Sequence, residues 1–526
     1  MAASEENITP LQERIRQLLE HLSRDLFEKE KPMRMALLSA LAGESIFLLG
    51  PPGVAKSMIA RRLKYAFDQA KSFEYLMGKF STPDEVFGPV SISKLKNEDK
   101  YERLTDKYLP GAHIVFLDEI WKASPPIQNS LLTVLNEKVF RNGEQEFRVD
   151  IRGLISASNE LPARGEGLEA LWDRFLIRMM VGNIDDDILF ERMLALPSRQ
   201  DSAELVPQEL KIRDHEYHAW REAMSQVKTP PHVLGLITHM RRTIRQRNET
   251  AEPSNRMYVS DRRWRKISQL LRAAAYLHGR DEVLVADCLL VSDCIWENER
   301  QTAEAADLVL GCIASFGYRK MVNLTGMEEE LENLREEITD ASRKVHTETQ
   351  TIPKIYKDKF NTPHYQLLGF WGETPVFIRA SDYEKLRHDQ MQHIPVYEQT
   401  NQTFRPFQTY GFLLKSAFVV ENKDRDVGIE TEEIEKEIIT PQTPTAEMKK
   451  IWSSQAQLLL QTCEQGIKKV EERRRQDETS LRGHLFIDSA HTIHALDSLV
   501  SLHDDLISLR LEIQKTRHLY ESVPES

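Results

Sequence analysis

The stretch Ile46-Phe-Leu-Leu-Gly-Pro-Pro-Gly-Val-Ala-Lys-Ser57 decides how the rest of this 526-residue chain is interpreted. Its apolar half predicts a buried strand, the small residues after it predict a tight loop, and Lys56 opens a helix. Such a loop points backbone N–H groups inward, and the helix dipole adds partial positive charge, so the segment suits a polyphosphate. We expect Lys56 on the β- and γ-phosphates and the Ser57 hydroxyl on Mg²⁺. The expected nucleotide-binding residues are Gly50, Pro51, Pro52, Gly53, Val54, Ala55, Lys56, Ser57 and Met58.

One position departs from the usual phosphate-loop spacing, because Ala55 stands where glycine is common. Alanine adopts helical angles easily but rarely a positive φ, so we expect the end of the loop to be helix-like already. A Gly-Pro turn that precedes a lysine by chance is the alternative. The strand, loop and helix context argues against it.

The composition predicts a multidomain globular protein without a general nucleic-acid surface. The chain is too long for one core, and its net charge is −12. Four cysteines without C-x-x-C spacing predict reduced thiols, a cytoplasmic location and no zinc site. The polar segment Met1–Glu6 lacks a signal-peptide core, and no apolar run reaches the roughly 18 residues of a membrane span.

Acidic and amide side chains follow two further apolar runs. Asp118 and Glu119 come directly after the run 114–117, and Asn159 follows the run 153–158. Strands buried on both faces read as continuous apolar runs, and open parallel sheets bind ligands at the carboxyl ends of their strands. We therefore expect Asp118 to hold Mg²⁺, Glu119 to act as general base and Asn159 to hold the attacking water.

The remaining pattern predicts an α/β P-loop core with an all-α lid, followed by a triple-helical domain that a small β-rich insert interrupts. The segment 80–109 reads as an exposed insertion, 168–178 and 327–345 as helices, and 430–437 as an acidic linker. The expected domains are 1–195 (nucleotide-binding), 196–308 (helical lid), 309–350 (first part of a helical stalk), 351–430 (β-rich insert) and 440–526 (second part of the stalk).

Seven stretches together resemble the AAA+ ATPases of the MoxR branch, and within it the regulatory ATPase variant A (RavA) subfamily. The similarity covers roughly residues 10–300 closely, and that subfamily shares the alanine at position 55. The matching stretches are Gly50–Ser57, Phe80–Pro89, Tyr101–Thr105, Ile114–Ala123, Ser158–Pro162, Asp173–Leu176 and Val259–Trp264.

The resemblance implies residue roles that composition does not show. Asn159 matches sensor 1, Arg174 matches the finger that completes a neighbouring subunit's site, and Arg262 matches the sensor 2 arginine of the lid. Arg263 is the alternative register for sensor 2. A finger supplied in trans implies a ring, typically a homo-hexamer, and such a finger is worth about 10³-fold or more in rate.

The resemblance also implies partners. The subfamily acts with a von Willebrand factor A (VWA) domain protein, and some members dock an inducible lysine decarboxylase through the β insert. The insert of this chain has no motif that matches the second partner, so that client stays open.

We therefore expect a cytoplasmic ATPase motor with chaperone-like or maturation duties on protein clients. It would use ATP and Mg²⁺, with Ser57 and Asp118 as metal ligands and Glu119, Asn159, Arg174 and Arg262 as catalytic residues. A nucleic-acid-stimulated, helicase-like motor is one alternative, which the acidic net charge disfavours. A small-molecule kinase is a second alternative, but it would need neither Glu119 nor a lid with a stalk. A non-catalytic, nucleotide-gated scaffold is a third, and an ATPase assay distinguishes it from an active motor.

Overall fold

The structure is a computed structural model. It describes residues 10–163, 165, 167–197, 205–369, 374–385, 392–400, 403–414, 417–420, 423–426, 428–481 and 483–521, so the segment Met1–Glu6 lies outside the described residues. The chain divides into two compact units, each taken by itself below. The first comprises Met1–Glu329 with Leu458–Ile513, and the second comprises Glu330–Gln457 with Gln514–Ser526.

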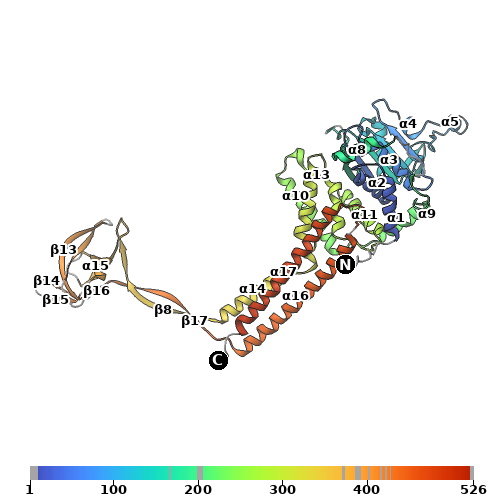
Figure 1. Cartoon of the computed structure of the whole chain (residues 1–526). Helices are drawn as coiled ribbons and strands as arrows, with labels where there is room; N and C mark the ends of the chain where they lie inside the picture. The colour runs from blue at the N-terminus through green and yellow to red at the C-terminus, as the bar shows by residue number, and fades with distance from the viewer. Residues whose placement is uncertain are drawn as a thin grey trace. The chain divides into compact units, whose positions relative to one another are not determined.

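A five-stranded parallel sheet organises the first unit (Figure 1). Its strands lie in the order β2-β3-β6-β1-β7, and each neighbouring pair is parallel. Strand β1 therefore lies between β6 and β7, and the segments that leave β1, β3 and β6 emerge at the same edge of the sheet. The strand bounds are Ser45–Leu49 (β1), Ser72–Leu76 (β2), Ile114–Asp118 (β3), Gly153–Ser158 (β6) and Ile177–Met180 (β7).

The strand β7 corrects the helix expected over 168–178. Only α7 (Glu169–Trp172) is helical there, and the chain then turns into the sheet beside β1. The three residues Ile177, Arg178 and Met179 are all buried, which removes the alternation that identifies most strands. A fully buried arginine in the middle of this strand further disguised it.

Helices cover the sheet, and an aromatic cluster fills the space beside β1. The Phe47 ring lies 5.2 Å from the rings of both Trp121 and Trp172, and 5.6 Å from Phe175. Aromatic pairs at these separations add to the stability from area burial alone. The helices of this part are α1 (Pro10–Ser23), α2 (Glu30–Ala42), α3 (Lys56–Leu63), α6 (Pro125–Glu137) and α8 (Asp187–Ala195).

The segment expected as an exposed insertion contains two short helices, α4 (Pro83–Phe87) and α5 (Ile92–Glu98). None of the α5 residues is buried, and Phe80 is 95% exposed. A β-hairpin around Gly143 forms from β4 (Val139–Asn142) and β5 (Gln145–Arg148).

The sequence between 205 and 313 is helical, as expected, and we call the helices α9 to α13 the lid. Ser260 caps α11 by accepting a hydrogen bond from the backbone N–H of Arg263, which fixes the start of this helix. A π-helical turn, Ile313–Gly317, follows α13. The bounds are Asp214–Gln226 (α9), Pro231–Thr250 (α10), Asp261–Leu277 (α11), Ser292–Ile295 (α12) and Gln301–Cys312 (α13).

Two buried histidines fasten the lid to the turn 483–488, which joins the long helices α16 (Ala446–Leu481) and α17 (Ser489–Glu521). His278 Nε2 accepts from Leu485 N (2.9 Å), and His484 Nδ1 accepts from Phe486 N (3.2 Å). The other nitrogens face Ala274 O and a carboxylate oxygen of Asp287. Burial lowers the pKa of both imidazoles, so each is neutral and each uses both ring nitrogens.

A second polar contact joins the lid end to α16. The Tyr318 hydroxyl donates to Asp477 (2.5 Å), and Arg473 pairs with the same carboxylate (2.9 Å). Tyr318 and Asp477 are buried, so breaking this contact would leave polar groups without water. The lid and the α16–α17 turn are therefore joined by interactions that are costly to break.

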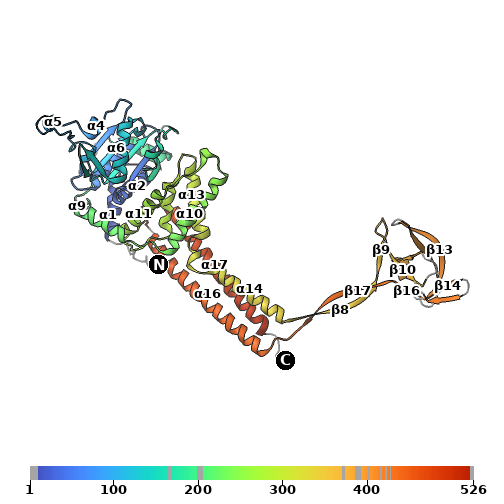
Figure 2. The same ribbon diagram turned by 180° about the vertical axis from the view of Figure 1, so that it is seen from behind.

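The second unit contains helices, a ribbon and a small β-rich part (Figure 2). Leu334 and Ile338 of α14 (Leu324–Ala341) pack with Trp452, Ala456 and Tyr520 of α16 and α17. The ribbon pairs β8 (Arg343–Pro353) antiparallel with β17 (Thr431–Pro441) over eleven residue pairs.

This ribbon corrects two expectations. The helix expected to reach Val345 ends at Ala341, and the acidic segment 430–437 is part of a strand. The β-rich part between the ribbon strands has an eight-strand sheet built from β9 to β16, consistent with the expected β insert. Its bounds are Ile355–Lys357 (β9), Pro363–Leu368 (β10), Val376–Arg379 (β11), Gln392–Thr400 (β12), Thr403–Leu414 (β13), Ala417–Val420 (β14), Lys423–Asp426 (β15) and Gly428–Ile429 (β16).

Among the helices that the structure describes, none is long and apolar enough to cross a bilayer.

Candidate functional site

The loop between β1 and α3 has the predicted course, with one correction. A side chain on Gly50 would collide with the carbonyl oxygen of Val181, so the loop passes the end of β7 too closely for any other residue. Gly53 has φ +82° with open space around it. Ala55, however, has φ 67° and ψ 19°, in the left-handed region and not the helical one that we expected. The helix starts one residue later, with Ile59 N donating to Ala55 O (3.1 Å).

Lys56 reaches back over this loop. Its ammonium donates to the carbonyl oxygens of Gly50 and Pro51 and to Asn159 Oδ1, the last at 2.7 Å. Burial lowers the pKa of Lys56, and the nearby carboxylates of Asp118 and Glu119 oppose that shift. A buried ammonium whose neighbours are mostly neutral oxygens is a strong site for a phosphate anion.

The acid pair lies where the sheet topology predicts. Asp118 ends β3 and accepts a hydrogen bond from Glu119 N (3.0 Å), and burial raises its pKa. Glu119 has φ 54°, a left-handed conformation that turns its side chain toward β6. There its carboxylate accepts from Asn159 Nδ2 (2.9 Å) and Ser158 Oγ (3.3 Å), and pairs with Lys122 (3.2 Å).

The structure thus brings three predicted residues into one hydrogen-bonded chain. Lys56 donates to Asn159, and Asn159 donates to Glu119, although the three come from the ends of three different strands. Asp118 joins this chain through the backbone of Glu119.

The donor set also suits a magnesium ion. Ser57 follows Lys56 in the first turn of α3 and is half-buried. No basic side chain forms an ion pair with Asp118 in the part of the chain that the structure describes. A hydroxyl and an uncompensated carboxylate are hard oxygen ligands of the kind Mg²⁺ prefers. The alternative acidic cluster of Asp150, Asp214 and His218 is filled by Arg152, which bonds to both carboxylates.

A cavity of about 560 Å³ opens beside the phosphate loop. Three separate segments line it: the α1–α2 connection, the phosphate loop with the start of α3, and the segment from the end of β7 through α8. The predicted residues Gly53, Val54, Ala55 and Met58 form one wall. Sequence reasoning missed the other lining residues, which are Asp25, Leu26, Phe27, Lys29, Gly182, Asn183, Ile184, Phe190 and Met193.

The predicted arginines form a separate group around Asp173. Arg262 binds this carboxylate at 2.6 Å and is 37% exposed, whereas Arg263 binds it at 2.9 Å and is 1% exposed. Arg263 also pairs with Glu297 (2.8 Å), so both of its terminal nitrogens are bonded within the fold. Arg174 donates to Ala170 O, and burial together with the Arg262 charge lowers its pKa.

The two registers left open by the sequence therefore differ in structure. Arg262 keeps access to solvent, whereas the buried Arg263 joins α11 to the segment before β7 through Asp173 and to the α12–α13 connection through Glu297. Arg262 lies with Arg174, and no hydrogen bond or ion pair joins either of them to Lys56 or Glu119 among the described residues. Nothing in the composition marks Asp173 as the acceptor that gathers them.

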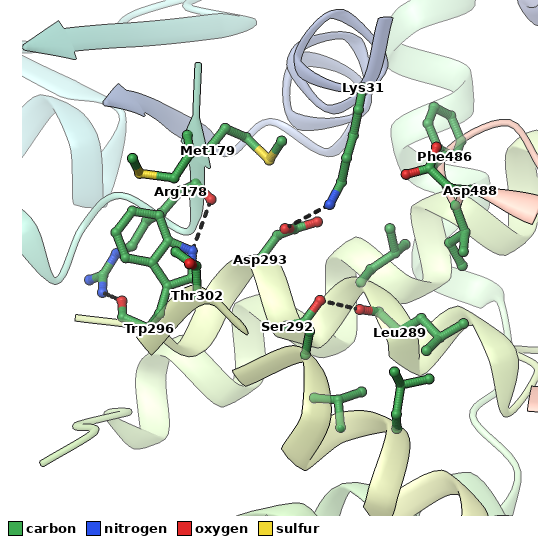
Figure 3. A pocket seen from close by; sticks show the side chains of 16 residues that line it. Lys31, Arg178, Met179, Leu289, Ser292, Asp293, Trp296, Thr302, Phe486 and Asp488 are labelled. Carbon is green, nitrogen blue, oxygen red and sulfur yellow. Dashed lines mark hydrogen bonds and ion pairs between the residues drawn. The ribbon is translucent and has the colours of Figure 1, made fainter. Parts of the chain in front are cut away.

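A smaller cavity of about 270 Å³ lies where α2, β7, the lid and the turn 483–488 meet (Figure 3). Lys31 pairs with Asp293 across it (3.1 Å), and Arg34 pairs with Asp488 nearby (2.5 Å). Trp296 donates its indole N–H to Arg178 O (3.2 Å) on the opposite wall. The contact of α2 with the lid and with the turn 483–488 thus combines half-buried ion pairs with unfilled space.

These features define a class before any comparison. The strand order, the phosphate loop after β1, the acid pair after β3 and the helical lid are those of an AAA+ P-loop protein.

Comparisons with known proteins define the family. Residues 13–216 match a family model described as "MoxR domain in the MoxR-vWA-beta-propeller ternary systems", and residues 232–309 match an AAA lid domain. Two uncharacterized proteins of Methanocaldococcus jannaschii, MJ0079 and MJ0812, are 33% and 32% identical over 291 and 282 residues. These alignments cover 55% and 54% of this chain and 72% and 71% of the relatives. The chain belongs to the MoxR family of AAA+ ATPases.

Two further likenesses are more distant. The structural protein ORF618 of Acidianus two-tailed virus is 26% identical over 251 residues, which are 44% of this chain and 41% of the viral protein. A crystal structure from Cytophaga hutchinsonii covers 58% of this chain and 94% of its own, at 17% identity and a TM-score of 0.46. A structural likeness that remote decides nothing about function.

Proposed function

We propose that this chain hydrolyses ATP and uses the energy as a ring-forming motor on protein clients. The observation that carries the proposal is the chain of hydrogen bonds from Lys56 through Asn159 to Glu119 at the edge of the parallel sheet. A phosphate-binding cation, an amide and a carboxylate are thereby held in direct hydrogen-bond contact. Hydrolysis of a phosphoanhydride requires these three groups close together.

Each residue has a distinct task in this proposal. Lys56 and the loop N–H groups bind the phosphates, and Ser57 and Asp118 would hold Mg²⁺. The metal, when bound, neutralises charge on the phosphate oxygens. Glu119 accepts the proton of the attacking water, and Asn159 orients that water while it fixes the carboxylate.

The 560 Å³ cavity would take the base and ribose. Its walls combine the apolar side chains of Leu26, Val54 and Met58 with those of Phe190 and Met193 from α8. An apolar slot next to a phosphate loop is the arrangement expected for a nucleoside.

We further propose that Arg174 and Arg262 act together on a neighbouring protomer's site, in a homo-hexamer. They lie side by side at Asp173, away from the Lys56 cluster, and Arg174 Nε is buried without a hydrogen-bond partner. Arg174 donates only to a backbone carbonyl, Ala170 O, and Arg262 shares Asp173 with Arg263, so both guanidiniums keep donors available for the anionic phosphates of another subunit.

The name of the matching family model supports a vWA-domain partner for this chain. A RavA-like architecture is supported by the three long helices with a β-rich part inserted after the first. We restrict the proposal to these features, since the described residues of the β insert identify no client such as a lysine decarboxylase. A cytoplasmic site of action remains a prediction from the four free cysteines.

The test is the substitution Glu119→Gln. The amide keeps the Asn159 contact but cannot accept a proton, so we expect hydrolysis to fall about 10²- to 10⁴-fold while ATP binding and ring formation persist. Glu160→Gln, one residue beyond Asn159 and exposed, is the matched control and should leave turnover unchanged. Turnover of the Glu119→Gln protein within about threefold of wild type would remove Glu119 from this role.

A further inference from the structure

Lys29 is a buried cation in the wall of the 560 Å³ cavity. It is the residue before α2 and only 5% exposed. Its ammonium lies between the carbonyl oxygens of Phe27 and Asn183, at 3.3 and 3.4 Å. Both of these residues also line the cavity, so the ammonium bridges two of the segments that form it.

The hydrogen bonds of Lys29 are fewer and longer than such a buried charge needs. An ammonium has three N–H donors, and N–H···O bonds in proteins are usually near 2.9–3.0 Å. Among the described residues no carboxylate forms an ion pair with Lys29. The buried arginines Arg178 and Arg263 of the same unit, by contrast, each form an ion pair with Glu297. Burial of an ion is costly unless it is paired and hydrogen-bonded. Lys29 therefore has capacity for one more acceptor.

Lys29 is not needed to join the α1–α2 connection to the segment after β7, because its neighbour Glu28 already joins them. The Glu28 carboxylate accepts from the backbone N–H groups of Asp185 (2.8 Å) and Asp186 (2.9 Å). These two short, charge-assisted bonds join the α1–α2 connection to the segment after β7. The long contacts of Lys29 add little to that junction.

We propose that Lys29 donates a hydrogen bond to a ring nitrogen of the adenine base and thereby contributes to base selection. The inference rests on the proposed function, because it assumes that a nucleotide occupies this cavity. Adenine offers N1, N3 and N7 as acceptors, and a lysine can only donate. The lining combines the apolar side chains of Val54, Met58 and Phe190 with the polar ones of Asp25 and Asn183. Lys29 is the one cation among the described lining residues, so it is the charged donor available to an acceptor on the edge of an aromatic ring.

The experiment compares ADP, its 1-, 3- and 7-deaza analogues and pyrophosphate as ligands, with Mg²⁺ present, for wild type and Lys29→Met. Methionine keeps the length of the side chain and removes the donors. We expect Lys29→Met to bind ADP about tenfold more weakly, the worth of a hydrogen bond from a charged group. Pyrophosphate affinity should not change. One deaza analogue should bind wild type about tenfold more weakly than ADP, and Lys29→Met should no longer distinguish that analogue from ADP.

Two further variants serve as controls. Lys29→Arg keeps a donor and should bind ADP within about threefold of wild type, and Lys64→Met removes a lysine outside the cavity and should match wild type. An equal loss for ADP and pyrophosphate in Lys29→Met would mean that Lys29 shapes the phosphate loop, and an unchanged ADP affinity would mean that it does not touch the base. Either result overturns the inference and leaves the proposed ATPase intact. A wild-type protein that binds neither ligand would overturn the proposed function itself.

Discussion

Replacing Ala55 by glycine should stabilise the nucleotide-binding unit, the opposite of what the same substitution does in most helices. Ala55 holds φ 67° and ψ 19° at the end of the phosphate loop. The left-handed conformation costs an L-residue roughly 1–2 kcal/mol, whereas glycine adopts it freely.

The expected gain is the difference between two opposing effects. Glycine relieves the roughly 1–2 kcal/mol of backbone strain, but its extra freedom in the unfolded chain costs about 0.4–1 kcal/mol. The net effect of Ala55→Gly is therefore a stabilisation of about 0.8 kcal/mol. Ala55→Val should destabilise by more than about 2 kcal/mol, since a β-branched side chain is strongly disfavoured at positive φ.

The assay is equilibrium urea unfolding followed by tryptophan fluorescence, because Trp121 and Trp172 lie against Phe47 of β1. Ala60→Gly is the matched control in the same helix. Ala60 is buried inside α3, so this substitution should cost about 1–2 kcal/mol from helix propensity and a lost methyl group. If Ala55→Gly destabilises as Ala60→Gly does, and Ala55→Val is neutral, then Ala55 is helical and the left-handed assignment is refuted.

Three further outcomes follow from the buried and paired charges. The unit that holds His278 and His484 should lose stability as the pH falls below about 6.5, because the pKa of each histidine is lower in the folded than in the unfolded chain. The unfolded chain then binds two more protons, so the loss reaches up to about 2.7 kcal/mol per pH unit. His278→Gln should roughly halve this slope, measured by urea unfolding between pH 7.5 and 5.5. Arg263→Met should destabilise by about 2–3 kcal/mol, because it removes a buried, charged partner from both Asp173 and Glu297, which keep Arg262 and Arg178. Arg262→Ala should cost under about 1 kcal/mol but reduce ATPase activity, and equal effects of the two substitutions on unfolding would contradict the distinction between them. Arg174→Ala subunits should regain activity when they are mixed with Glu119→Gln subunits. Where the two variants are neighbours, the intact Glu119 site of the first receives the intact Arg174 finger of the second. Full activity of an isolated monomer would exclude a finger supplied in trans.

The sequence was sufficient to predict those site residues that lie at the end of a strand or in the turn that follows it. The apolar runs before Gly50, Asp118 and Asn159 predicted three buried strands of a parallel sheet. The structure makes these strands neighbours and places the side chains after them in contact. Strand β7 could not be found this way, because its buried Arg178 is satisfied by Glu297 and by the backbone carbonyl of Trp296, which lie far along the chain in the lid.

The 560 Å³ cavity beside the phosphate loop could not be predicted from sequence patterns either. Phe27 and Asn183 belong to connections far apart in the chain, and neither has a neighbour that signals a ligand. The ribbon strand β17 was misread for a different reason, since a two-stranded ribbon exposed on both faces can carry glutamates at successive positions. Its composition then resembles that of a linker, although every residue of the strand lies opposite a residue of β8.

The contacts that tie the lid to the turn 483–488 give the first unit the mechanics of a lever. The 24 residues of α16 from Leu458 to Leu481 extend about 36 Å from that turn, at 1.5 Å per residue. Because His278 and Tyr318 fix the lid to the turn end of the helix, a lid rotation of about 10° would carry Leu458 sideways by about 6 Å. A small rotation of the lid would thus move the Leu458 end of this helical segment by more than the width of a side chain.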